Sequence, residues 1–276
     1  DVTIADLTVR NVGSNGIAIQ GNDRPLLYNL RVVDSGDQLI KVNPVGDGSD
    51  NGVLACSLIE YSDTAPDSYT NGISAHNAHG WVVRDNTWRR IRGNTDAYLP
   101  TILFWSQSRD TEVVRNRLID CSGGIAFGNA GHDAGDHLGG LVANNFIYRS
   151  LWGDVAIEMT HASSWLVAYN TVFLAGPSPA GLTWSMEARF TDASGSFAYN
   201  LTNMEVINRD AATGTMTGNL TNASADWFRD PASGDLHLGP SGSAAIGAGD
   251  QLPQVLGDID GDARGSHPDV GADQHI

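Results

Sequence analysis

The sequence predicts an all-β chain built as a parallel solenoid, in which short strands stack coil upon coil. Composition points first to strands and turns, because Gly contributes 32 of the 276 residues and Asn and Asp are plentiful. No long stretch of Ala, Leu, Glu and Lys repeats with a helical period. A short unit instead recurs along the chain, which is the signature of a repeat architecture.

Each unit opens with an apolar run around an Asn or Asp, as in "VVRNRLI" and "VAYNTVF". Asn tolerates the left-handed backbone of a tight turn, and stacked amides can hydrogen-bond as a ladder. One unit cannot bury its own apolar face, whereas stacked units can. The alternative, a β-sandwich, would need hairpin turns that these units lack. The residues in this place are Asp6, Asn29, Asn86, Asn116, Asn145, Asn170, Asn200 and Asn219, with Cys56 in one unit.

A second short strand follows most of these runs, and each has two apolar residues spaced by two. The residues between and after this inward pair must point outward. Lys41, the only lysine, is therefore expected on an exposed sheet face with His76, Trp105 and Glu158. We align the inward pairs as Ile17 and Ile19, Ile40 and Val42, Ile73 and Ala75, Ile102 and Phe104, Ile125 and Phe127, Ile157 and Met159, and Leu182 and Trp184.

The C-terminal part has a composition of its own, with "GDLHLGPSGSAAIGAGD" followed by "DIDGDARGSHPDVGADQ". The repeat and this tail together resemble the right-handed parallel β-helix proteins of the pectate-lyase-like superfamily, many of them secreted by bacteria. The resemblance covers nearly the whole chain. It implies a right-handed β-helix over residues 1–222, a tail over 223–276 that packs on the last coils, and a groove along one parallel sheet in which sugar chains often lie.

The superfamily includes polysaccharide lyases, glycoside hydrolases, epimerases and non-catalytic phage or adhesin proteins, so the fold alone leaves the function open. The resemblance implies a secreted, extracellular or periplasmic protein with a polysaccharide as partner. A segment upstream of residue 1 is expected, because the first residues already have the pattern of a strand and a turn. The net charge of −16 argues against nucleic acid and anionic membranes as partners. Cys56 and Cys121 are expected to be free and buried.

Two groups of candidate site residues lie on the outward face of the second strands. The first group has Lys41 and His76 as catalytic candidates, with Asn43, Asn77, Trp105 and Ser106 as substrate-binding candidates. The second group has Glu158 and Glu187 as catalytic candidates, with His161 and Arg189 for binding. Lys41 and Glu158 are four coils apart, or about 19 Å, so they cannot act on one bond.

The leading hypothesis is a lyase-like enzyme acting on a polysaccharide that contains uronic acids. Lys41 or His76 would be the base, and Trp105 would stack on a sugar ring. Lyases of the superfamily often use calcium, but no carboxylate cluster lies beside the first group. The alternatives are a non-catalytic binding or structural β-helix, and a glycoside hydrolase that uses Glu158 and Glu187.

Metal sites have weaker support in the sequence. Asp258, Asp260 and Asp262 alternate as in calcium loops, although no Glu follows at the twelfth position. Arg264, close behind them, is expected to pair with an Asp. The loop "GHDAGDHLGG" offers His132 and Asp136 among other metal-ligating residue types, but its spacing matches no specific site. Calcium is therefore a possible cofactor rather than an implied one.

Overall fold

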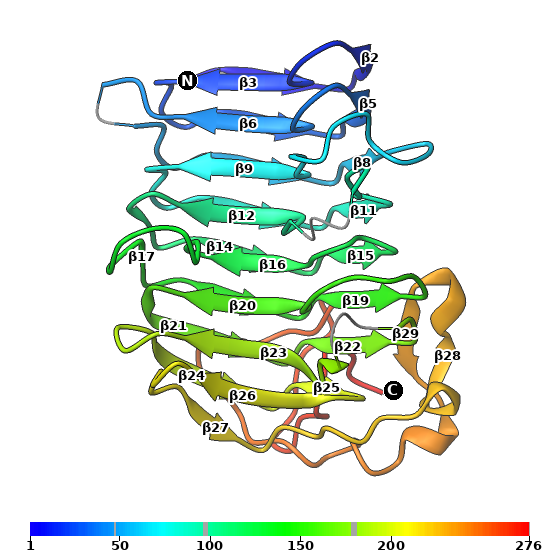
Figure 1. Ribbon diagram of the computed structural model, residues 1–276. Coiled ribbons are helices and arrows are strands. Elements are labelled where there is room, and N and C mark those ends of the chain that lie inside the picture. The colour runs from blue at the N-terminus through cyan, green and yellow to red at the C-terminus, as the bar shows by residue number, and fades with distance from the viewer. Residues whose placement is uncertain (47, 96–98, 178–180, 276) are drawn as a thin grey trace.

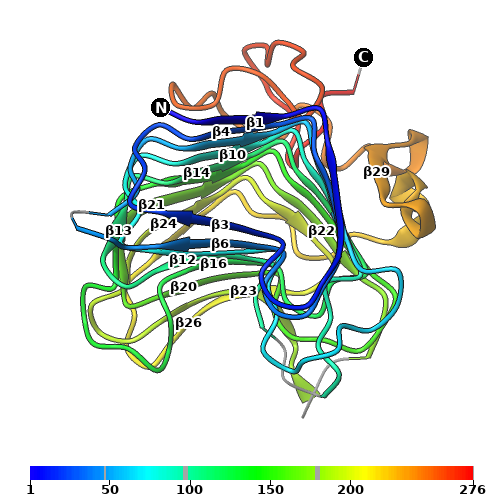
Figure 2. The same cartoon turned by 90° about the horizontal axis from the view of Figure 1, so that it is seen from above.

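The predicted solenoid is confirmed by a computed structural model, which describes residues 1–46, 48–95, 99–177 and 181–275. Three parallel sheets, named here sheets A, B and C, run along the coil axis (Figure 1). Seen from its N-terminal end, the chain turns clockwise as it recedes, so the β-helix is right-handed (Figure 2).

The strands of each sheet follow one another from coil to coil in the order of the chain. Sheet A contains β1 (Thr3–Ala5), β4 (Leu26–Tyr28), β7 (Val53–Ala55), β10 (Val82–Arg84), β14 (Glu112–Val114), β18 (Leu141–Ala143), β21 (Ala162–Ala168), β24 (Ser194–Ala198) and β27 (Thr215–Thr217). The short β17 (His137–Leu138) also pairs with β21, and β13 (Ser108–Arg109) pairs with β17. Sheet B contains β2 (Thr8–Val12), β5 (Arg31–Ser35), β8 (Leu58–Glu60), β11 (Thr87–Arg89), β15 (Arg117–Ile119), β19 (Phe146–Arg149), β22 (Thr171–Leu174) and β25 (Leu201–Thr202). Sheet C contains β3 (Ile17–Gln20), β6 (Ile40–Asn43), β9 (Ile73–His76), β12 (Ile102–Trp105), β16 (Ile125–Phe127), β20 (Ile157–Thr160), β23 (Trp184–Arg189) and β26 (Glu205–Arg209).

The turn from sheet A to sheet B contains the asparagine ladder. The Oδ1 atom of Asn145 accepts hydrogen bonds from the backbone N–H and the side-chain amide of Asn116, at 2.9 and 3.1 Å. Asn145 in turn donates to the Val113 carbonyl at 2.8 Å and to Oδ1 of Asn170 at 2.9 Å. The same pattern continues to Asn219, and Ser57 takes the ladder position on the coil before Asn86. The amides therefore tie each coil to its neighbours inside the core.

The ladder position was predicted one residue too early in the first coils. Asp6, Asn29 and Cys56 do not point into the core; they have the left-handed backbone, with φ between 50° and 56°. In later coils the residue before the ladder Asn has this backbone, for example Arg115 at φ 54° and Tyr169 at φ 52°. The turn thus has a left-handed residue followed by an inward one, and an Asn can stand at either position. Cys56 is consequently exposed, contrary to expectation, whereas Cys121 is buried, and both are free.

Aliphatic and aromatic side chains fill the interior of the coils. The predicted inward residues of sheet C, such as Ile73, Phe104 and Met159, are 0% exposed. The exception is the pair Leu182 and Trp184, because β23 pairs with β20 through Met186 opposite Ile157 and Ala188 opposite Met159.

The tail packs on sheets A and B and leaves sheet C uncovered (Figure 2). It contains η2 (Ala225–Trp227), β28 (Phe228–Asp230), η3 (Pro231–Ser233), β29 (Asp235–Leu238) and η4 (Pro240–Gly242). A second core forms between tail residues such as Leu236 and Val270 and outward residues of the coils such as Phe146. Arg264 does not pair with an Asp as expected. It donates to the Asp269 and Gly271 carbonyls and to Oδ1 of Asn144.

We predict that Asn145→Ala lowers the free energy of unfolding by about 2–3 kcal/mol, because Asn116 loses its acceptor and the Val113 carbonyl loses its donor in the core. Asn219→Ala, at the end of the ladder, should cost about 1 kcal/mol, since Asn219 is only partly buried. Urea denaturation with an unchanged m-value measures both. Equal losses of unfolding free energy in the two variants would contradict the buried ladder as the source of the stabilisation.

Candidate active site on sheet C

The outward face of sheet C is the floor of a groove rather than an open surface. Connections from sheet B and turns toward sheet A extend past the sheet on its two sides (Figure 2). Residues of the central outward column are consequently hidden, with Lys41 8%, Leu103 3% and Ala126 0% exposed. The expectation that Lys41 stands on an exposed face is therefore wrong. It occupies the predicted outward column, but neighbouring side chains and loops cover it.

The Lys41 cluster joins residues of neighbouring coils. The Lys41 Nζ atom lies 2.8 Å from Nε2 of His76 and 3.1 Å from Oγ of Ser74. Lys41 and Ser74 are directly opposite each other on β6 and β9, and the long lysine side chain reaches diagonally to His76. The Trp105 ring lies edge-on to His76 at a centroid distance of 4.4 Å. Three of the residues predicted for the first site, Lys41, His76 and Trp105, are thus brought together.

Burial changes the protonation of this cluster. It lowers the pKa of Lys41, although the charge of Asp37 acts in the opposite direction. Burial, together with the charges of Lys41 and His132, lowers the pKa of His76 to about 4. His76 is therefore neutral near pH 7, and its Nε2 atom accepts a hydrogen bond from Lys41. A lysine that is pushed toward its neutral form can accept a proton, as a general base must.

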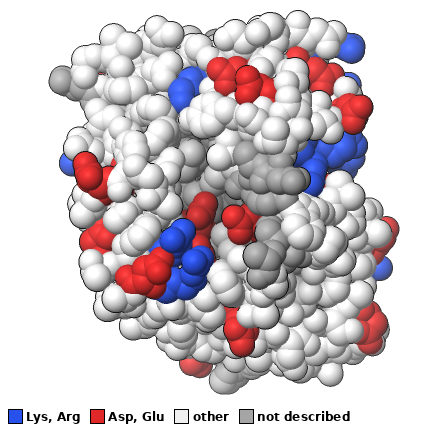
Figure 3. Space-filling view, in the orientation of Figure 1, with Lys and Arg blue, Asp and Glu red and all other residues white. Residues whose placement is uncertain are grey.

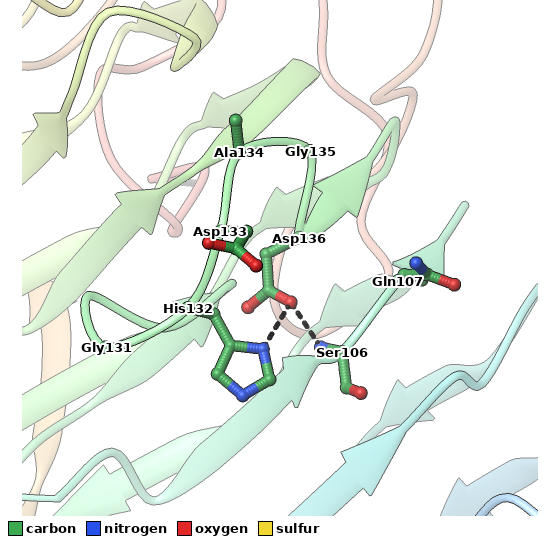
Figure 4. A pocket seen from close by; sticks show the side chains of 8 residues that line it. All are labelled: Ser106, Gln107, Gly131, His132, Asp133, Ala134, Gly135 and Asp136. Carbon is green, nitrogen blue, oxygen red and sulfur yellow. Dashed lines mark hydrogen bonds and ion pairs between the residues drawn. The ribbon is translucent and has the colours of Figure 1, made fainter.

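A pocket of about 540 Å³ opens beside Trp105, where β12 ends. It is lined by Ser106, Gln107 and the loop 131–136 (Figure 4). His132 lies at its wall with its ring 4.3 Å from Trp105, and its Nδ1 atom is 3.0 Å from Oδ1 of Asp136. The buried Asp136 also accepts the backbone N–H of Ser106 at 2.7 Å (Figure 4). The rings of Trp105 and His132 therefore lie between the groove floor and this pocket.

Small residues interrupt the floor below Trp105. Ala126 of β16 pairs with Leu103 on one side and Glu158 on the other. Gly128 follows with φ +77°, and a β-carbon there would lie 1.8 Å from the Thr160 carbonyl oxygen. The space-filling view shows a hollow in the middle of this face (Figure 3). Acidic and basic side chains gather along the lower edge of the hollow.

Glu158 and Glu187 lie side by side across this hollow. They are directly opposite each other on β20 and β23, which pair in a continuous register. Their backbones are therefore one strand spacing apart, about 4.8 Å. Oε2 of Glu187 accepts from the Trp184 indole at 2.6 Å and from Arg209 at 2.8 Å. Glu187 is 3% exposed, so it is a fixed and covered anion.

Glu158 differs from its neighbour in protonation. It is only partly buried, and the Thr160 side chain lies close enough to its carboxyl group to lower its pKa. Burial, with the charges of Asp154 and Glu187, raises the pKa of Glu158 to about 8, and Arg189 opposes this only in part. Glu158 therefore holds a proton at neutral pH, while Glu187 forms an ion pair with Arg209. A carboxyl group that stays protonated near neutral pH can act as a general acid.

The other predicted binding residues lie in the turns that follow sheet C. Asn77, Ser106 and His161 have a left-handed backbone, with φ between 46° and 55°. The side-chain oxygen of Asn77 bonds His79, and His161 pairs with Asp192 at 2.9 Å. Asn77 and His161 therefore form contacts within the corner between sheets C and A. Of the three, Ser106 lines the pocket.

Asn43 and Arg189 remain on sheet C itself. Asn43 is half-buried at the end of β6, opposite Gln20. Arg189 is opposite Thr160 on the neighbouring strand. Its guanidinium pairs with Asp210 at 2.9 Å and lies 4.0 Å from Glu187.

The predicted metal candidates do not converge. The buried Asp258 accepts the backbone N–H groups of Asp260 and Asp262 at 2.9 and 2.8 Å, so it closes a turn. The carboxylate of Asp260 is directed at His237, at 2.7 Å. In the loop beside the groove, His132 bonds Asp136, whereas His137 is buried and bonds Thr111.

Sequence reasoning missed several residues of the site. Tyr69, in the connection after β8, lies close enough to Ser74 for the serine hydroxyl to affect its pKa, and burial raises that pKa. Asp154 precedes β20 and acts on Glu158. Arg209 and Trp184 hold Glu187. Tyr69 and Asp154 come from irregular connections, whose path the strand pattern does not fix.

We predict that Glu158→Gln becomes progressively more stabilising as pH rises. Folding raises the pKa of this carboxyl group, so its contribution to the free energy of unfolding is fully present below the unfolded pKa of 4.5. The contribution is lost as pH rises through about 8. Gln imitates the protonated form throughout. The Tm of the variant relative to the native protein should therefore rise by roughly 2–4 °C between pH 5 and pH 9. The exposed control Glu205→Gln should show a flat difference; a flat difference for Glu158→Gln would contradict the raised pKa.

No helix among the described residues is long and apolar enough to cross a membrane. No model of a known protein family matches the chain, and no curated protein matches it either. Two solved structures of PfbA, a surface adhesin of Streptococcus pneumoniae, are similar. One has a TM-score of 0.55 and 16% identity over 80% of this chain and 60% of that chain. The other has a TM-score of 0.51 and 14% identity, again over 80% of this chain, and 65% of that chain. The chain thus spans less than two thirds of these adhesin chains, and the likeness shows the shared β-helix fold.

Proposed function

We propose that the chain binds an acidic polysaccharide along sheet C and cleaves it by β-elimination at the Lys41 cluster. The observation that supports this most directly is the buried Lys41 amine, held between His76 and Ser74 at the floor of a groove. Burial penalises the charged form of lysine, so a buried lysine costs stability. Such residues with a shifted pKa are common at functional sites. Burial at this place favours the neutral amine that can remove a proton next to a carboxyl group.

The geometry favours Lys41 over His76 as the base. His76 is a weak base with its pKa lowered to about 4, and its Nε2 atom already accepts from Lys41. In β-elimination the Lys41 amine takes the C5 proton of a uronic acid, and the electrons of that bond form the C4–C5 double bond. The C4–O4 bond breaks, and the leaving oxygen takes a proton. Tyr69, which interacts with Ser74, would supply this proton, and its raised pKa keeps its hydroxyl protonated.

Trp105 supplies the binding surface beside this centre. Its indole is half-buried between the His76 and His132 rings, with centroids 4.4 and 4.3 Å away. A flat aromatic face next to hydroxyl and imidazole groups suits a sugar, whose ring has an apolar face and polar edges. The pocket at Ser106 and Gln107 offers a polar subsite next to it. Binding to a polysaccharide outside the cell fits this arrangement, as does the surface role of the PfbA adhesins.

A glycoside hydrolase centre at Glu158 is the second candidate, supported by its raised pKa of about 8. Glu158 would be the acid that protonates the leaving oxygen. Glu187 is covered and held by Arg209 and Trp184, so Asp154 is the more accessible carboxylate near Glu158. Hydrolysis and elimination would thus use different residues of the same groove.

We predict that Lys41→Met lowers kcat/KM for elimination by about 10²–10⁴-fold, since it keeps the volume and removes the base. Incubation with a panel of acidic polysaccharides would be followed by the ultraviolet absorbance of unsaturated sugar ends. Glu205→Gln, at an exposed residue outside both centres, is the control and should leave the rate unchanged. Absorbance that survives in Lys41→Met would contradict the assignment.

The same panel separates hydrolysis and binding from elimination. Reducing ends without absorbance, lost in Glu158→Gln and retained in Lys41→Met, would establish the hydrolase instead. A folded protein that binds a polysaccharide without turnover would be a binding module. Whether the protein is a lyase, a hydrolase or a binding module, Trp105→Ala should weaken polysaccharide binding by about three- to tenfold, because the stacking of a sugar ring on the indole is lost. Affinity electrophoresis in the polysaccharide measures this directly.

A further inference from the structure

A second group of titratable residues lies far from the groove, where the tail packs on sheet B. His237 on β29, Asp260 in the turn 258–262 and Asp273 near the C-terminus each direct one ligand-type atom toward the others, and these atoms all lie within 4.8 Å of one another. The hairpin of β28 and β29 lies beside β19 and β22 (Figure 1). The Phe146 ring of β19 lies edge-on to His237 at 5.0 Å. The group therefore joins three separate segments of the tail on the coil surface.

Carboxylates face both ring nitrogens of His237. Asp235 contacts Nδ1 of His237, and Asp260 lies 2.7 Å from Nε2. Two guanidinium groups border the group: the NH2 atom of Arg117 is 3.4 Å from Oδ1 of Asp260, and Arg229 lies close enough for its charge to act on Asp273.

Asp273 adds a buried carboxylate to this group. It is 5% exposed, and Oδ2 accepts the Leu238 backbone N–H at 2.7 Å. One of its carboxylate oxygens lies within 4.8 Å of the ligand-type atoms of His237 and Asp260. A buried carboxylate is normally paired or bound to a metal, because its desolvation is costly.

We propose that His237, Asp260 and Asp273 bind a divalent transition-metal ion of the Zn²⁺ type, which fixes the tail on the coils. One imidazole and two carboxylates are the ligand types of such ions, at about 2.0–2.2 Å from the metal. Ligand atoms of a tetrahedral ion at these distances are roughly 3.3–3.6 Å apart. The atoms of the group that are farthest apart must therefore approach one another, and Nε2 of His237 and Oδ2 of Asp260, now 2.7 Å apart, must separate slightly. Asp235 orients the imidazole from behind, as carboxylates do for metal-binding histidines.

The proposal predicts one ion per chain, measured by titration with Co²⁺ as a coloured stand-in for Zn²⁺. We expect a visible Co²⁺ absorption band that saturates at one equivalent and is abolished by Zn²⁺. Zn²⁺ should also raise the Tm of the full chain, because it binds the folded state only. His237→Gln and Asp273→Asn should each remove the band and the Tm increase. Excess Ca²⁺ should not displace the ion, since it prefers all-oxygen ligands.

The matched control is His267→Gln, which removes an exposed histidine of the same tail. It should leave the Co²⁺ band and the Zn²⁺-dependent Tm increase unchanged. A native protein with no band and no Tm change would overturn the proposal and leave His237 as a protonated partner of Asp235 and Asp260. A band that persists in His237→Gln but is lost in His267→Gln would also overturn it. Circular dichroism of each metal-free variant shows whether it is folded before the titration.

Discussion

The buried amides at the turn between sheets A and B are the interaction on which the rest of the structure depends. Asn116, Asn145 and Asn170 each bond the backbone or side chain of neighbouring coils, so the ladder fixes how one coil lies over the next. A slip of one residue would leave these polar groups without partners in the core, at a cost of about 1–3 kcal/mol each. The register of sheet B, and through it that of sheet C, is set at this corner.

That register decides which side chains can meet on sheet C. Residues in equivalent places of successive coils come to lie one strand spacing apart, as Lys41 and Ser74 do on β6 and β9. Residues two positions apart in neighbouring coils become diagonal neighbours, which allows Lys41 to reach His76. A site on a β-helix is therefore assembled from positions about 30 residues apart in sequence, and its geometry is as rigid as the ladder.

Much of the fold could be predicted because the same pattern of inward and outward residues recurs in successive coils. Inward positions such as Ile73 and Met159 followed from a period of two. Aligning them gave two neighbouring outward columns, one with Lys41 and one with His76 and Trp105. The ladder position could not be fixed in the first coils, because Asn and Asp suit both the left-handed residue and the inward one. Asp6 and Asn29 occupy the former, as φ values of 56° and 50° show.

The candidate site was less predictable for reasons outside the strands. The apolar spacing favoured Leu182 and Trp184 as the inward pair of β23, but this strand pairs with β20 four residues further along, which places Glu187 directly opposite Glu158. Burial of Lys41 depends on irregular connections, of which Tyr69 is a part, whose course follows from packing rather than periodicity. The alternation of a strand tells which way a side chain points, but not what will cover it.

The placement of the tail gives sheet C its special position. Residues 223–275 cover outward apolar residues of sheets A and B, such as Phe146 and Leu166, which would otherwise be in water. On sheet C the corresponding column holds Lys41, Glu158 and Glu187, and the tail does not cover it. Burial lowers the pKa of Lys41 and raises that of Glu158. Lys41 and Glu158 are about 19 Å apart along the coil axis, so one extended polysaccharide would contact both centres. The interruption of the floor at Ala126 and Gly128 gives such a chain room between them.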